Sequence, residues 1–169
     1  MGSLVIWVLF GYLACVTIPL AYSDVRERRL PNSYVLPGFV IVFWAIAVCW
    51  IHDSAPPIAS LLGGLVVVLI FYCGAALGGF GMGDVKLATL IVMSLGLLSW
   101  WAAFVAITLA GAVGGVAGYT VLWRSAGRRE AATGGAALRA RGVPFGVPLL
   151  IGLWGAAVLW GVVFLWGAE

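Results

Sequence analysis

Six apolar stretches follow one another along this 169-residue chain, separated by polar or glycine-rich breaks. They lie at about residues 4–22, 34–51, 58–77, 85–98, 101–123 and 144–166. Most approach or exceed the roughly 20 residues with which an α-helix crosses the hydrocarbon of a bilayer, whereas the fourth is short. Long uninterrupted runs indicate helices, because a membrane β-barrel would show alternating segments of about ten residues. The pattern predicts an all-α, polytopic membrane helical bundle with about six transmembrane helices, in a single domain over residues 1–169.

The composition agrees with a membrane protein. Hydrophobic residues make up 64% of the chain and charged residues only 9%, against roughly 25% charged residues in soluble domains. Nine Lys and Arg residues against six Asp and Glu residues leave a net charge of +3. In a membrane protein the distribution of basic residues indicates which connections face the cytoplasm. The positive net charge is therefore not taken as a sign of nucleic-acid binding, and membrane lipids are the expected surroundings.

The basic residues are confined to three connections. All nine Lys and Arg residues fall within 24–32, 78–86 and 124–142. Connections rich in Lys and Arg stay in the cytoplasm under the positive-inside rule. With six crossings, both chain termini then lie outside, and residues 124–142 form a cytoplasmic loop. Asp24 and Asp84 consequently fall on the same, cytoplasmic side.

These two acids are the candidates for chemistry. Asp84 lies in Gly79–Lys86, a glycine-rich break between two apolar runs. A charged Asp at the centre of a membrane helix costs about 2.5–3.5 kcal/mol, so an acid beside hydrocarbon suggests a function. Asp24 is the second acid at an inner span end. The other four acids have solvated or arginine-rich surroundings: Asp53, Glu169, Glu27 and Glu130.

Two carboxyl groups that lie close together in a poorly solvated site share a proton. One can act as a base toward water while the other, protonated, polarises a peptide carbonyl, as in an aspartic protease. Two alternatives remain open for these acids. An Asp near a span end is commonly an interfacial residue or a helix cap, and the acids of a small transporter or assembly scaffold bind protons or substrate.

No metal or cofactor is expected at this pair of acids. The single histidine of the chain, His52, falls on the opposite side of the membrane from Asp24 and Asp84. Zinc sites require His or Cys ligands. Two carboxylates alone would hold Mg²⁺ only together with substrate phosphates or many waters.

Three segments, in order, resemble the signatures of the type IV prepilin peptidases, which are membrane-embedded aspartic proteases with a Gly-x-Gly-Asp motif. The segments are Asp24–Asn32 with its Leu30-Pro31-Asn32 end, Gly81-Met82-Gly83-Asp84 with the following Lys86, and Val143–Pro148 with Pro144 and Gly146. Gly-x-Gly-Asp alone is a weak signal. Together the three segments, on a plan of six spans, cover nearly the whole chain.

The resemblance implies that Asp24 and Asp84 are the catalytic aspartates. The reaction would be cleavage of the leader peptide of a type IV prepilin or pseudopilin, at the cytoplasmic face of a prokaryotic cytoplasmic membrane. The partners would be the basic leader and the apolar N-terminal helix that follows it. Glu27 is a candidate for binding the basic leader, because an acid attracts positive charge whereas the neighbouring arginines would repel the leader. Lys86 is expected to reach lipid headgroups, and Pro31 and Asn32 to turn the loop into the second span.

The chain departs from the larger family members, which carry paired Cys-x-x-Cys motifs in an amino-terminal cytoplasmic segment and also methylate the new pilin terminus. Only two residues precede Ser3 and the first span here, and no Cys-x-x-Cys pair occurs. Peptidase activity without N-methyltransferase activity is therefore expected.

Two further questions stay open at the level of sequence. A presenilin-like intramembrane protease of broader specificity also has Gly-x-Gly-Asp, although its first acid normally sits inside a span, whereas Asp24 borders a charged loop. Small-residue patterns such as Gly111-x-x-x-Gly115 and Gly114-x-x-x-Gly118 are expected to pack helices within the chain, and would also suit a homodimer.

Overall fold

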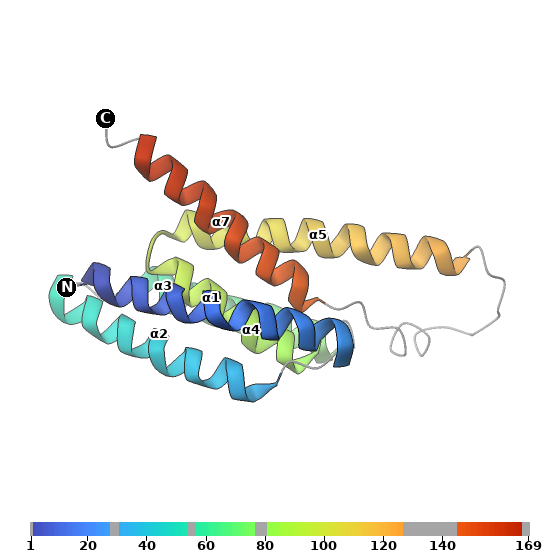
Figure 1. The fold of residues 1–169 in the computed structure, drawn as a ribbon, viewed down its shortest axis with the longest axis horizontal. Coiled ribbons are helices and arrows are strands. Elements are labelled where there is room, and N and C mark those ends of the chain that lie inside the picture. Colours follow the sequence, from blue (N-terminus) through green and yellow to red (C-terminus); the bar gives the residue numbers. More distant parts are fainter. Residues whose placement is uncertain (1, 28–30, 54–56, 77–80, 127–144, 167–169) are drawn as a thin grey trace.

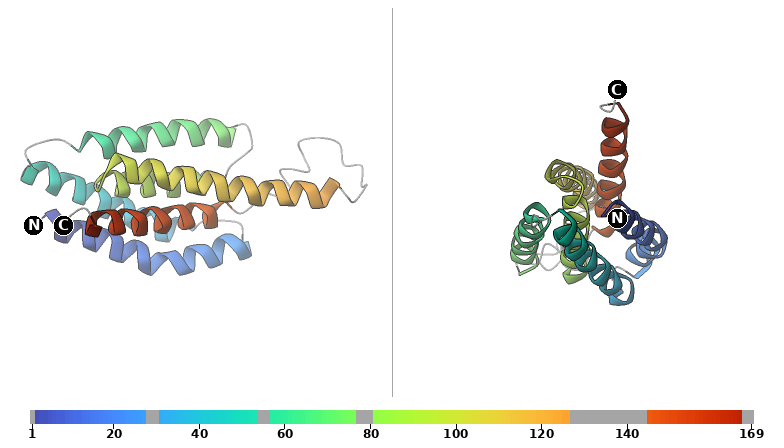
Figure 2. Two further views of the ribbon diagram at one scale, coloured as in Figure 1. Left: turned by 90° about the horizontal axis from the view of Figure 1, so that it is seen from above. Right: turned by 90° about the vertical axis from the view of Figure 1, so that its left-hand side faces the viewer.

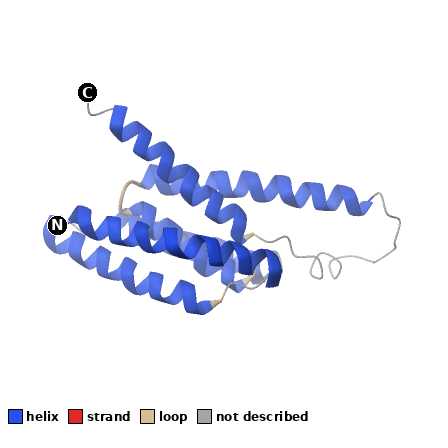
Figure 3. Ribbon diagram, in the orientation of Figure 1, coloured by secondary structure: helices blue, strands red, loops and turns tan. Residues whose placement is uncertain are grey.

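A computed structural model describes residues 2–27, 31–53, 57–76, 81–126 and 145–166. Within these ranges the chain folds into helices and has no strand (Figures 1 and 3). The helices are α1 (Gly2–Glu27), α2 (Asn32–Asp53), α3 (Ile58–Ala76), α4 (Met82–Gly96), α5 (Trp100–Ala126) and α7 (Gly146–Trp166). Four of them, α1, α2, α3 and α5, are long and apolar enough to cross a membrane. The prediction of an all-α membrane bundle is confirmed.

Consecutive helices run in opposite directions along the bundle (Figures 1 and 2). The carboxyl end of α1 and the amino ends of α4 and α7 therefore lie at the same end of the molecule. We call this end, which carries Asp24, Asp84 and Gly146, the site end. Segments far apart in the sequence meet there because the chain alternates in direction.

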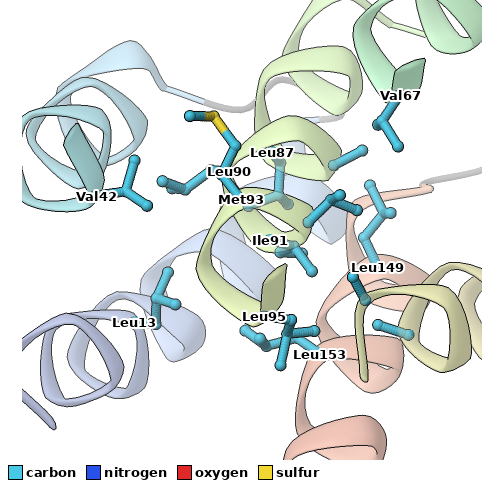
Figure 4. Packing of buried hydrophobic residues seen from close by; sticks show 14 of the residues in the cluster. Leu13, Val42, Val67, Leu87, Leu90, Ile91, Met93, Leu95, Leu149 and Leu153 are labelled. Carbon is cyan, nitrogen blue, oxygen red and sulfur yellow. The ribbon is translucent and has the colours of Figure 1, made fainter. Parts of the chain in front are cut away.

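The short helix α4 occupies the centre of the bundle. It contacts α1, α2, α3, α5 and α7, and every residue from Leu87 to Gly96 is buried. Figure 4 shows side chains of the surrounding helices, such as Leu13 and Leu153, gathered around those of α4. Protein rather than lipid surrounds α4, so a 15-residue helix with a break before it is tolerated at membrane depth.

Close approach of helix backbones holds this core together. A Cβ at Gly96 of α4 would lie 2.7 Å from the Cα of Ser60 in α3, and a Cβ at Gly152 of α7 would overlap the carbonyl oxygen of Ala106 in α5. Small residues at such crossings permit the van der Waals packing that associates helices in a membrane. The buried Ser60 Oγ also donates a hydrogen bond to the Met93 carbonyl oxygen at 2.6 Å.

A polar link joins α1 to α7 at a partly buried position. The Trp154 Nε1–H group of α7 donates to Thr17 Oγ1 of α1 at 2.9 Å. The Thr17 hydroxyl in turn donates to the Leu13 carbonyl oxygen at 2.6 Å. In the part of the chain that the structure describes, no buried side-chain nitrogen or oxygen lacks a hydrogen-bond partner, as expected where water cannot compensate.

Three expectations from the sequence are corrected. Helix α1 continues to Glu27, beyond the predicted end of the first span at residue 22, so Asp24 belongs to a helix and not to the following loop. Residues 124–126 are the end of α5, because a helix continues past the hydrocarbon as long as its backbone hydrogen bonds do. The rest of the predicted loop lies outside the described residues.

The third correction concerns the glycine patterns of α5. Cβ atoms at Gly111 and Gly115 would meet no described neighbour within 4 Å, so these two glycines do not pack against other described helices of the chain. Gly114 is different, because a Cβ there would overlap the ring of Phe145. Gly114 thus packs against a described residue, whereas Gly111 and Gly115 do not.

Candidate active site

Asp24 lies in the last turn of α1, with 4% of its surface exposed. Its Oδ2 atom accepts a hydrogen bond from the Val147 N–H at 3.0 Å, and the Gly146 N–H also donates to this carboxylate. The first N–H groups of a helix have no partner within the helix. The acid of α1 therefore caps the amino end of α7.

Asp84 lies in the first turn of α4 and caps that helix itself. Its Oδ2 atom accepts from the Gly81 N–H at 3.2 Å, while the Asp84 N–H donates to the Gly81 carbonyl oxygen at 3.0 Å. The interpretation of an Asp at a span end as a cap of the adjoining helix is correct for Asp84, whereas Asp24 caps a different helix, α7. Capping leaves each carboxylate with further lone pairs, so it does not exclude chemistry.

The electrostatic environment couples the two acids. Asp84 lies outside the apolar segments that are candidate spans. Burial raises the pKa of Asp84 to about 6, the hydrogen bond from Gly81 lowers it, and the neighbouring Asp24 carboxylate raises it further. An interaction between the charges means that the structure brings the two predicted catalytic residues to one place. Each carboxylate of such a pair disfavours ionisation of the other.

Lys86 and Asn32 connect the two segments that carry the acids. The Lys86 Nζ atom donates to Asn32 Oδ1 at 3.0 Å, so the predicted headgroup ligand has a protein partner at the start of α2. Pro31 precedes that helix, and its carbonyl oxygen accepts from the Tyr34 N–H at 3.2 Å. The first two of the three chain segments that resemble family signatures are thus in direct contact.

The remaining predicted residues are distributed around the acids. Met82 is exposed and Gly83 is half-buried in the first turn of α4. Glu27 is the last residue of α1, but its side chain lies outside the described residues, as does Pro144. Over the described ranges, no group of three or more His, Cys, Asp and Glu side chains could hold a metal ion.

Sequence reasoning did not identify the contact between Asp24 and α7. The donors are backbone N–H groups, and no side-chain type marks them. The signal that could have found it was Gly146 within the third resembling segment, since a glycine suggests close approach of another group. A Cβ at position 146 would indeed lie 2.8 Å from both Cγ and Oδ2 of Asp24.

Comparison with known proteins agrees with the resemblance of the motifs. The model of the type IV leader peptidase family matches residues 9–123, which is more than half of the chain. The matched residues contain both Asp24 and Asp84, whereas α7 lies beyond them. The searches of curated proteins and of solved structures found no match.

Proposed function

Since the chain belongs to the type IV leader peptidase family, we propose that it is an aspartic endopeptidase of the membrane. Its substrates are type IV prepilin-like or pseudopilin chains, from which it removes the leader peptide. The observation that carries this proposal is the pair of Asp24 and Asp84, which come from separate helices and interact at the site end.

The chemistry follows from one proton shared by two carboxyl groups. The ionised carboxylate takes a proton from water as the water oxygen attacks the scissile carbonyl carbon. The protonated partner gives its proton to the carbonyl oxygen, which forms a tetrahedral diol. Collapse of the diol breaks the carbon–nitrogen bond. The acid that had accepted a proton gives it to the leaving nitrogen, while a hydroxyl group of the diol returns its proton to the partner carboxylate. Both carboxyl groups then return to the starting state.

The proposed site faces the cytoplasm of a prokaryotic cell. Every Lys and Arg residue lies in connections assigned to that side, which favours a cytoplasmic site end under the positive-inside rule. A scissile bond between a basic leader and an apolar helix would lie at the same depth. Glu27, three residues after Asp24 on α1, is the acid that we propose for contact with the leader.

We further propose that the protein does not methylate the new amino terminus. The support is the lack of paired Cys-x-x-Cys motifs, since the chain has three cysteines and none are so spaced. Mass spectrometry of the cleaved substrate would show an unmodified terminus. A methyl group that depends on this protein would contradict the proposal.

The test is co-expression with an epitope-tagged prepilin in cells that lack their own leader peptidase. Asp24→Asn and Asp84→Asn should each abolish leader removal, while Asp53→Asn, the same change at the far end of α2, should cleave like the native chain. Membrane fractionation would verify that all variants insert. Continued cleavage by either site variant would exclude a catalytic pair.

The same experiment separates the alternatives. A transporter or scaffold would leave the prepilin intact even with the native chain. A presenilin-like protease of broader specificity would cut the prepilin together with unrelated membrane helices that have no basic leader. A panel of such helices, expressed in place of the prepilin, therefore distinguishes the two kinds of protease.

A further inference from the structure

We propose that the amino end of α7 is a third component of the active site, in which the backbone of Gly146 and Val147 positions the Asp24 carboxylate. This inference rests on the proposed function. It adds positioning residues to the reaction, from a helix outside the stretch that matches the family. Neither residue supplies a side chain to the chemistry.

The hydrogen-bond donors in the first turn of α7 leave Asp24 as their acceptor. Pro148 has no N–H, and the Leu149 N–H donates to the Phe145 carbonyl oxygen at 3.2 Å. The remaining donors are the N–H groups of Gly146 and Val147, and both point to the carboxylate of Asp24. Such donors would carry a desolvation penalty if they were left unpaired in a buried position. The hydrogen bonds therefore satisfy both the N–H donors of α7 and the carboxylate of Asp24.

Gly146 also sets how closely the carboxylate can approach. A Cβ at this position would lie 2.8 Å from Asp24 Cγ and 3.2 Å from Oδ1. The whole carboxyl group thus lies against the backbone of α7. Any larger residue would push the carboxyl group away from these donors.

Contacts independent of α1 hold this end of α7 in place. The Phe145 ring, directly before the helix, lies 6.2 Å from the Phe71 ring of α3 at an interplanar angle of 59°. It also covers Gly114 of α5. A support that is anchored on α3 and α5 can orient a side chain from α1, which is what a positioning element must do.

The experiment compares two variants of the support with a matched control. Gly146→Ala introduces the crowding methyl group, and Val147→Pro removes an N–H donor at a position in the first turn, where proline is tolerated. Gly161→Ala makes the same exchange on the same helix, where a Cβ would meet no described atom within 4 Å. The assay uses purified protein in detergent and a synthetic peptide that contains a basic leader and the first apolar residues of a prepilin.

We expect kcat to fall about 10- to 100-fold in both site variants, because misplacement of a catalytic group by about 1 Å can cost 100-fold. KM should stay within about twofold, since the substrate contacts are unchanged. The control should match the native chain in both constants. Native kcat in Gly146→Ala and Val147→Pro, or a change confined to KM, would overturn the positioning role.

A spectroscopic measurement separates this inference from the proposed function. Infrared difference spectra, native minus Asp24→Asn, isolate the carboxylate bands of Asp24. The bands should shift when the same difference is taken in the Gly146→Ala background and should not shift in the Gly161→Ala background. Unshifted bands would refute the inference. A native chain that cuts no prepilin would instead refute the proposed function, whatever the spectra show.

Discussion

Replacing Asp84 with asparagine should stabilise the folded protein at neutral and alkaline pH, although it removes a proposed catalytic residue. Burial raises the pKa of Asp84 from 3.8 to about 6, which means that the folded state disfavours the ionised carboxylate. Asparagine has no charge to bury, and its side-chain oxygen can still accept the Gly81 N–H. The variant therefore keeps the helix cap and loses the electrostatic cost.

The size of the effect follows from linkage between proton binding and folding. A shift from 3.8 to about 6 corresponds to about 3 kcal/mol as an upper bound, at 1.36 kcal/mol for each pKa unit. Solvent screening at the partly exposed carboxyl group reduces this to roughly 1–2 kcal/mol. The gain in unfolding free energy should be complete at pH values above the pKa of Asp84 in the folded protein. It should decline as the pH falls toward 3.8, the ordinary pKa of the side chain. Below that pH the carboxyl group is protonated in both states, so the gain disappears.

The assay is denaturant-induced unfolding in detergent micelles, followed by tryptophan fluorescence at about pH 8 and about pH 4, on either side of the folded pKa. The free energy of unfolding of Asp84→Asn should exceed that of the native chain by the full gain at the higher pH and by only a small part of it at the lower pH. Gly161→Ala serves as a control whose difference from the native chain does not depend on pH. Equal stability at the higher pH, or the same gain at both values, would refute the reasoning from burial.

Three more predictions concern helix packing, the link between the two signature segments, and metals. Gly152→Ala should lower the free energy of unfolding by about 1–3 kcal/mol, because the new Cβ would overlap the Ala106 carbonyl oxygen; Gly161→Ala should not lower it. A double-mutant cycle of Lys86→Met and Asn32→Ala should give a coupling of about 0.5–1.5 kcal/mol in unfolding free energy, whereas a lysine that contacts only lipid gives none. EDTA should leave peptide cleavage unchanged, and activity that is lost to EDTA and restored by Mg²⁺ would contradict a reaction carried by two carboxyl groups alone.

The sequence predicted the class of fold because apolar runs of membrane length leave few other structures for the backbone. It also indicated Asp24 and Asp84. The chain has only six acidic residues, so an acid that borders an apolar run is easily noticed. The short run at 85–98 correctly marked α4 as unusual. Its central position could not be read from hydropathy, because a helix wrapped by protein and a helix facing lipid are equally apolar.

The local surroundings of Asp24 were beyond prediction for a different reason. The apolar run ends at Tyr22 while α1 continues to Glu27, because helix hydrogen bonds extend through charged residues without a break. Asp24 then meets backbone donors 123 residues away in the sequence, and such donors are identical for nearly every residue type. Only a three-dimensional structure reveals which helix end an acid reaches.

The cap that Asp24 forms on α7 has a consequence for how the protein matures in the cell. Asp24 leaves the ribosome with α1, whereas its hydrogen-bond donors leave later, with α7. Until α7 docks beside Phe71 and Gly114, the Asp24 carboxylate lacks the N–H donors of Gly146 and Val147 that complete the proposed site. Under the proposed function, cleavage of a leader peptide would therefore depend on the docking of α7 against α3 and α5.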